Sequence, residues 1–161
     1  MSDIATVAGR PGRLIVASLK PGAQLTSSIE EVCREYEVET AVITSVVGTV
    51  EDLYLRNPRD ITTLPIRKEH EWAEEIDTTH LQRKMEILSI QGNVCRVDGE
   101  LWAHCHGLFS EAGGAVRGGH VFRATIWSQG EVFLTELLDA RVDRKYDHEV
   151  TGLPQIQLHR A

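Results

Sequence analysis

The hydrophobic positions follow two periods along the chain, one typical of strands and one of a helix. Apolar residues from Arg13 to Leu19 predict a first strand, and Lys20-Pro21-Gly22 has the composition of a turn. Between Gln24 and Glu37 the apolar positions have helical spacing, which predicts an amphipathic helix. Its buried stripe is formed by Leu25, Ile29, Val32, Cys33 and Tyr36, and the residues expected to face outward are Glu30, Glu31, Arg34 and Glu35.

Most of the remaining chain has the alternation and the β-branched residues of strands. Two strands are predicted from Thr40 to Asn57, with Gly48 at a bend or bulge between them. Residues 57–80 contain two prolines and many charges. They predict an irregular connection with one short strand around Pro65 to Trp72.

The second half predicts two hairpins. Strands Lys84–Val97 and Glu100–Ser110 are joined by Asp98-Gly99, a pair typical of a two-residue turn. After a glycine-rich loop over residues 111–119, strands His120–Trp127 and Glu131–Leu138 are expected to meet at residues 128–130.

These elements predict an α+β fold, in which a curled, mainly antiparallel β-sheet packs with one main helix. The expected domain organisation is a flexible N-terminal arm over residues 1–12, a single domain over 13–140 and a C-terminal extension over 141–161.

Composition and charge narrow the class of protein. The 161 residues are 42% hydrophobic and 25% charged, as in an ordinary globular domain. No apolar run is long enough to cross a bilayer, and the N-terminus lacks the pattern of a signal peptide, so we expect a cytoplasmic protein. Seventeen Lys and Arg residues against 24 Asp and Glu give a net charge of −7, which disfavours binding to a phosphate backbone.

Three histidines in the second half have a spacing typical of metal ligands. His104 and His106 lie two residues apart on a predicted strand, so both side chains project from one face, about 6.6–7 Å apart. His120 opens the next predicted strand, and a hairpin return would bring it beside them. Three imidazoles leave one position of a tetrahedral zinc site open. Imidazole also suits iron, nickel and copper, so the predicted cofactor is zinc or another divalent transition metal.

Further candidate residues surround this predicted site. A carboxylate on a neighbouring strand could act as a general base or orient a histidine, and the four candidates are Glu86, Glu100, Glu131 and Glu136. The other histidines are expected to be solvated, namely His70, His80, His148 and His159. We expect Cys33, Cys95 and Cys105 to be reduced and mostly buried, with Cys105 pointing away from the two flanking histidines.

The order of these motifs resembles the plant and prokaryote conserved (PPC) domain family. The matching segments are RLIVASLKPGAQLTSSIEEVC, AVITSVVGTVEDLYL, MEILSIQGNVCRVDGELWAHCHG and GGAVRGGHVF, which together run from about Arg13 to Leu138. The resemblance implies a compact α+β domain that forms homotrimers, and it strengthens the assignment of His104, His106 and His120 as metal ligands.

Plant members of this family carry an AT-hook, a short arginine-rich element that enters the DNA minor groove. Here Gly9-Arg10-Pro11 is followed by Gly12-Arg13, but Ala8 stands where the hook has its first arginine. The chain therefore resembles the bacterial type without an AT-hook, in which DNA binding is an alternative function for a regulatory homotrimer.

At the level of fold, the PPC domain is also similar to acetolactate decarboxylase, which holds zinc with an HxH pair and a later histidine. This similarity implies chemistry of the lyase or hydrolase type on a small oxygen-rich metabolite, or sensing of such a metabolite. Whether the protein is an enzyme stays open at this point.

Overall fold

The structure is a computed structural model and describes residues 4–58, 64–65 and 76–160. Within these ranges the chain forms one helix and seven strands. In chain order they are β1 (Arg10–Leu19), α1 (Leu25–Glu35), β2 (Ala41–Pro58), β3 (Ile76–Val97), β4 (Glu100–Ser110), β5 (Val116–Leu138), β6 (Ala140–Asp147) and β7 (Leu153–Arg160).

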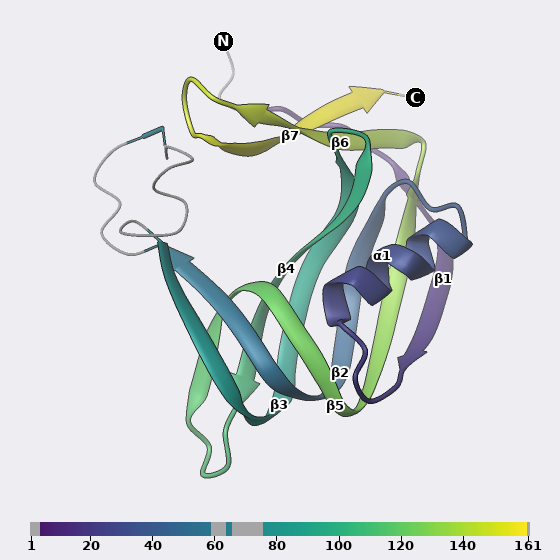
Figure 1. The fold of residues 1–161 in the computed structure, drawn as a ribbon. Helices are drawn as coiled ribbons and strands as arrows, with labels where there is room; N and C mark the ends of the chain where they lie inside the picture. Colours follow the sequence, from purple (N-terminus) through teal and green to yellow (C-terminus); the bar gives the residue numbers. More distant parts are fainter. Residues whose placement is uncertain (1–3, 59–63, 66–75, 161) are drawn as a thin grey trace.

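Four of the strands close into a ring. β2 pairs with β3 and β5, and β4 pairs with the same two strands, always antiparallel. β1 adds to this ring by pairing with β5, and Figure 1 shows α1 lying against one side of the curled sheet. The predicted α+β fold, a curled, mainly antiparallel sheet with one main helix, is confirmed.

The helix packs through the predicted apolar stripe. Leu25, Ile29 and Cys33 are fully buried, while Tyr36 is 43% exposed because the helix ends at Glu35 and Tyr36 is its C-cap. The sheet contributes most of the remaining core, and its largest fully buried side chains include Leu53, Met85, Ile90, Phe109 and Ile126. One core thus extends between the helix and the inner face of the ring.

Two long strands continue through positions where breaks were predicted. β2 is a single strand, and it bends at Gly48, where a Cβ atom would overlap the carbonyl oxygen of Gln129. The prediction of a hairpin at residues 128–130 is wrong. β5 accommodates extra residues as a bulge opposite Thr49, whose hydroxyl hydrogen-bonds that of Ser128 at 2.6 Å. Gly130 then pairs with Gly48, so the turn-like composition produces a bend within one strand.

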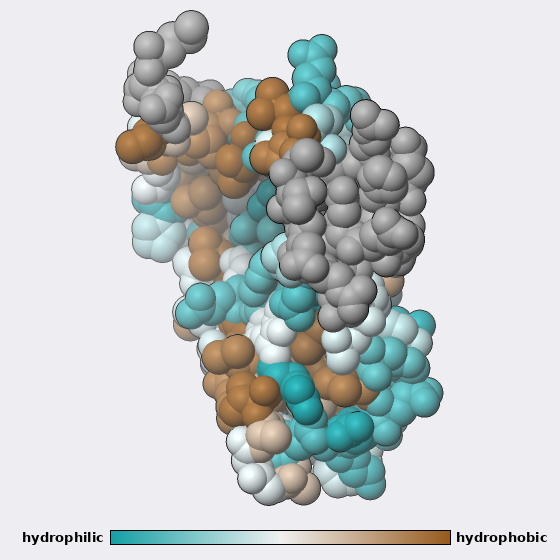
Figure 2. Space-filling model, turned by 90° about the vertical axis from the view of Figure 1, so that its left-hand side faces the viewer, coloured by the Kyte–Doolittle hydropathy of each residue, from teal (hydrophilic) through white to brown (hydrophobic). Residues whose placement is uncertain are grey.

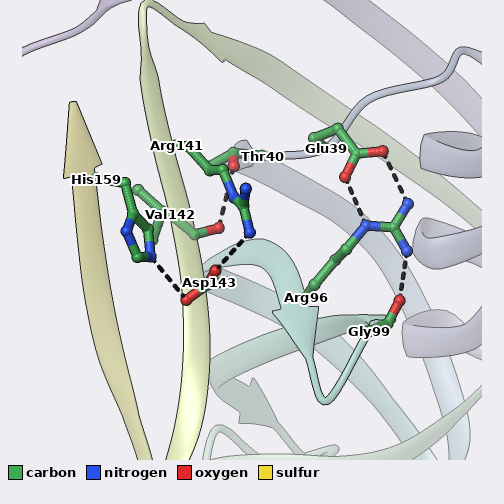
Figure 3. A network of polar contacts seen from close by, with 8 residues as sticks. All are labelled: Glu39, Thr40, Arg96, Gly99, Arg141, Val142, Asp143 and His159. Carbon is green, nitrogen blue, oxygen red and sulfur yellow. Dashed lines mark hydrogen bonds and ion pairs between the residues drawn. The ribbon is translucent and has the colours of Figure 1, made fainter. Parts of the chain in front are cut away.

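The predicted C-terminal extension forms a hairpin of β6 and β7. β6 runs parallel to the end of β3, and Figure 3 shows the contacts that surround this junction. The hydroxyl of Thr40 donates to the carbonyl of Val142 at 3.4 Å, while Arg96 of β3 is bound by the Glu39 carboxylate and by a carbonyl of the β3–β4 turn. Of these contacts, the hydrogen bond between Thr40 and Val142 joins the hairpin to the ring, whereas those of Arg96 lie beside the junction.

The remaining differences from the predictions concern element limits. β1 begins at Arg10, so it includes the last residues of the predicted N-terminal arm. Residues 76–80 belong to β3 instead of an irregular connection, and the short strand predicted around Pro65 to Trp72 lies largely outside the described residues. No helix in the described part of the chain is long and apolar enough to cross a membrane.

Candidate metal centre

Strict alternation along β4 places two of the predicted ligands on one face. Leu101, Ala103 and Cys105 are buried toward the core, whereas the alternate side chains of Trp102, His104 and His106 point to the opposite face. Burial also raises the pKa of the Cys105 thiol to about 12, so this cysteine is protonated at neutral pH. Cys105 therefore lacks both the direction and the thiolate of a ligand to an ion between the histidines.

The third histidine reaches the site through the pairing of β4 with β5. His120 lies directly opposite His106 in this pairing, four residues inside β5. A side chain at the preceding Gly119 would meet the amide of Asn57 and come within 2.9 Å of the carbonyl oxygen of Arg56. Glycine at this position lets β5 lie close to the end of β2, which explains the glycine before His120.

The three imidazoles have the separation that one metal ion requires. Their ligand atoms all lie within 4.8 Å of one another, and the Nε2 atoms of His104 and His106 are 3.2 Å apart. Zinc–nitrogen bonds of about 2.0–2.1 Å at tetrahedral angles place two nitrogens roughly 3.3 Å apart. The separation of these nitrogens therefore suits a tetrahedral ion after local rearrangement of the rings.

Their surroundings favour neutral imidazoles. Burial lowers the pKa of His104 to about 4, helped by the positive charge of Arg144, and burial lowers the pKa of His120 to about 4, helped by His106 and Arg56. Neutral imidazole is the form that binds a metal ion. At neutral pH these two ligands need lose no proton before binding.

The three histidines line a cavity of about 780 Å³. The Trp102 ring stacks on the His104 ring, with centroids 5.0 Å apart and 15° between the planes. Phe122 and residues of the β6–β7 hairpin form further walls. Figure 2 shows hydrophobic surface running from the upper end of the molecule, where β6 and β7 lie in Figure 1, toward its middle. A ligand at the open metal position would thus meet a mainly apolar pocket.

Arg144 of β6 contacts one of the predicted ligands, His104, directly. Its Nη2 atom donates to Nδ1 of His104 at 3.0 Å and to Oδ1 of Asn93 at 3.4 Å, while Nη1 donates to the carbonyl of Pro154 at 3.2 Å. The hairpin beyond the predicted domain therefore supplies a positive charge to the site.

The predicted carboxylates are distributed differently. Glu100 lines the cavity, but Glu86 and Glu131 are exposed outside its lining, and Glu136 is buried against Arg13, which donates to both carboxylate oxygens at 2.9 Å. Glu30 was predicted to face outward, and this is wrong. Its carboxylate lines the cavity and accepts a hydrogen bond from the backbone N–H of Ala103 at 3.1 Å, because α1 packs beside β4.

The other predicted histidines that the structure describes lie outside the cavity lining. His80 contacts Asp52 at 2.6 Å and stacks on Tyr54, His159 contacts Asp143 at 3.2 Å, and His148 is exposed. His70 lies outside the described residues. The prediction of free, buried cysteines is confirmed for Cys33, Cys95 and Cys105.

Several residues that line the cavity were not predicted from the sequence. Trp102 and Phe122 had a usable signal, because each lies two positions from a predicted ligand on the same strand and so shares its face. Arg144 had none, since its position depends on a hairpin that returns to the end of β3.

Comparison with known proteins identifies the family. Residues 6–138 match the model of the Plants and Prokaryotes Conserved (PCC) domain. The chain belongs to this family. Among solved structures, a plant- and prokaryote-conserved protein from Pyrococcus horikoshii is 26% identical, with a TM-score of 0.77, over 94% of this chain and 97% of that one. A metal-containing protein from Archaeoglobus fulgidus is 28% identical, with a TM-score of 0.78, over 96% and 99% of the two chains.

Two further similarities are more limited. A candidate DNA-binding protein from Bacteroides thetaiotaomicron is 19% identical over 92% of this PCC-domain chain and 96% of its own, with a TM-score of 0.73, which shows a shared fold. The bifunctional protein GlmU of a Synechococcus strain is 26% identical over 152 residues. The match covers 92% of this chain but only 21% of that protein's length.

Proposed function

We propose that this PCC-domain protein binds a divalent transition metal, zinc in the first instance, through His104, His106 and His120. The observation that carries the proposal is the convergence of three imidazoles, from one face of two paired strands, on a cavity of about 780 Å³. The similarity to a metal-containing protein over nearly the whole chain supports it.

The open fourth position is proposed to receive an oxygen atom of a small metabolite. When bound, the metal would act as a Lewis acid toward that oxygen. The cavity exceeds the volume of the ion alone, and its largely apolar walls offer a surface for the body of a small ligand. The same site would serve turnover of the lyase or hydrolase type or sensing of the metabolite, and an activity screen on the metal-loaded protein separates these two uses.

Metal analysis tests the proposal. The purified protein is stripped with a chelator, reloaded with zinc, dialysed, and measured by elemental mass spectrometry. We expect one zinc per chain, loss of that zinc in His106→Ala, and retention in the matched control His148→Ala, whose side chain is exposed outside the cavity. Wild-type protein that takes up no zinc, cobalt, nickel or iron(II) would contradict the proposal, as would full zinc binding by His106→Ala.

Self-association is proposed on a separate observation. The edge strand β1 exposes Leu14 at 65% and Val16 at 59%, and Val42 of β2 is 48% exposed. Leu14 and Val42 both lie opposite Thr135 of β5, so they belong to one region of the sheet. We propose that this apolar region supports a homotrimer. Sedimentation equilibrium should give a molecular mass three times that of one chain. Val16→Lys places a charge in the apolar region, so it should dissociate the assembly and lower the measured mass.

DNA binding is the alternative function, and the ion pairs of β1 oppose it. Arg10 is paired with Asp139 at 2.6 Å, and Arg13 is held by both oxygens of Glu136, so neither arginine belongs to a free basic arm. Together with the net charge of −7, this predicts no mobility shift of an AT-rich duplex at low salt. A shift whose affinity falls steeply with salt would favour DNA binding instead.

A further inference from the structure

Arg144 is the first member of a chain of hydrogen bonds that ends at the predicted metal position. Its Nη2 atom is 3.0 Å from Nδ1 of His104, and Nε2 of His104 is 3.2 Å from Nε2 of His106. A guanidinium has only donors, so Nδ1 of His104 accepts. The ring hydrogen of a neutral His104 then lies on Nε2 and is donated to His106.

This arrangement excludes a metal ion on Nε2 of His104. A neutral imidazole that binds a metal through Nε2 carries its hydrogen on Nδ1, where metal-binding histidines ordinarily donate to an acceptor. Two hydrogens would then face each other between His104 and Arg144. A metal ion on Nε2 of His104 would therefore require that this contact break, which would free the guanidinium from His104.

The guanidinium belongs to a residue that lines the cavity. It lies 5.6 Å from the centre of the Trp102 ring, and its Nε atom is buried without a hydrogen-bond partner among the described residues. Of the two cavity carboxylates, Glu30 already accepts a hydrogen bond from the backbone of Ala103. The Nη2 donor that would lose His104 thus belongs to a residue that lines the cavity, where a ligand would lie.

The walls indicate what kind of ligand would be held there. A guanidinium presents parallel N–H donors that match a carboxylate. Beside it the cavity is bounded by apolar side chains of β3, β4, β5 and the C-terminal hairpin, among them Trp102, Phe122 and Leu153. A second arginine, Arg56, lies in the lining with its guanidinium carbon 3.8 Å from the Phe122 ring centre. One anionic group with an apolar body fits these surroundings.

We propose that the ligand of this site is a small carboxylate with an apolar body, and that Arg144 holds its carboxylate after a metal ion has displaced that side chain from His104. The inference rests on the proposed metal-binding function and adds the class of ligand and the order of events. Because the coupling between metal and carboxylate is reciprocal, the carboxylate also strengthens metal binding. Arg144 lies outside residues 6–138, the part matched by the family model.

Calorimetric titration with benzoate tests the inference, with benzamide as the neutral analogue of the same shape and inorganic phosphate as an oxyanion without an apolar body. Zinc content is measured first on every sample. We expect benzoate to bind zinc-loaded protein at least about tenfold more tightly than zinc-free protein, and benzamide and phosphate to bind at least about tenfold more weakly than benzoate.

Variants assign the effect to the arginine. Arg144→Gln should keep one zinc per chain and lose at least about tenfold in benzoate affinity. Lys145→Gln removes the same charge from the next residue of β6, which is exposed, and should leave the affinity unchanged. Arg144→Lys keeps the charge without the paired donors, so its benzoate affinity should lie between those of Arg144→Gln and Lys145→Gln. The comparison of benzoate with benzamide uses wild-type protein and depends on no variant.

Each contrary result overturns a stated part of the inference. Equal benzoate affinity in Arg144→Gln, or equal binding of benzamide, removes the role of the arginine. Phosphate binding that depends on Arg144 without benzoate binding overturns the choice of a carboxylate. Equal benzoate affinity with and without zinc overturns the coupling. Zinc uptake without benzoate binding contradicts this inference alone, whereas absence of zinc uptake contradicts the proposed function and the coupling with it.

Discussion

The histidine-bearing strands β4 and β5 and the C-terminal hairpin of β6 and β7 contribute to the same cavity in different ways. β4 and β5 supply the three imidazoles, and their positions follow from alternation and from one antiparallel register. The hairpin supplies Arg144, whose position follows from two parallel pairings with the end of β3. The predicted metal ligands are thus built into the ring of strands, while the residue that we propose to face the ligand is added from outside it.

The largest effect on stability is expected in the core of the ring. Phe109→Ala removes a fully buried side chain from β4, and the cavity left behind should lower the free energy of unfolding by about 3–5 kcal/mol. Urea denaturation of the metal-free protein measures this. The neighbour Leu108 is 49% exposed on the opposite face, so Leu108→Ala should cost roughly 0.5 kcal/mol or less. Similar losses for both variants would contradict the placement of the core.

His104 and His120 should make the stability of the metal-free protein depend on pH. His104 and His120 have pKa values of about 4 in the folded protein, below the value of 6.5 of a free histidine. The unfolded chain therefore binds more protons below pH 6.5, and stability falls as the pH drops from about 6.5 to 4. Urea denaturation at a series of pH values checks this.

The variant His104→Asn, His120→Asn separates this effect from carboxylate titration. It should show a flatter profile between pH 6.5 and 4, because it lacks the contribution of these two histidines while the carboxylates that also titrate in this window are present in both proteins. An unchanged slope in the variant would mean that other groups cause the loss of stability.

Trp102 connects the two regions, since its ring stacks on His104 and also lies beneath Arg144. Trp102→Ala should weaken zinc binding by roughly 3- to 10-fold, because the His104 ring loses the contact that fixes its orientation. Competition with a zinc-sensitive dye measures the affinity. Trp127→Ala serves as the control, since Trp127 lies on β5 outside the cavity lining. Equal effects of the two substitutions would remove Trp102 from the site.

The smallest effect is expected at the surface contacts beside the hairpin. Glu39→Gln weakens the pair between Glu39, whose side chain is 64% exposed, and Arg96, which is 41% exposed. Such pairs contribute about 0.2–1 kcal/mol, so the melting temperature should change little. Zinc affinity should not change. A large loss of stability would contradict the description of this pair, drawn in Figure 3, as a weak contact at the surface.

The sequence by itself determined the elements whose signals are local. The period of two along residues 101–109 fixed which face carries His104 and His106, and Asp98-Gly99 fixed the turn before them, with φ values of 49° and 91°. The helical spacing of Leu25, Ile29 and Cys33 likewise fixed the buried stripe of α1. Each of these depends on residues that are neighbours in the chain, so the pattern alone contains the physical cause.

Only the tertiary structure decided which distant residues meet. The composition of residues 128–130 favours a turn, but pairing with β1 and β2 on both sides keeps β5 continuous, so long-range hydrogen bonds override a local preference. Glu30 was expected at the surface, and the packing of α1 beside β4 turns it toward the cavity. Arg144 reaches His104 because a parallel pairing, which no local pattern specifies, places β6 at the end of β3.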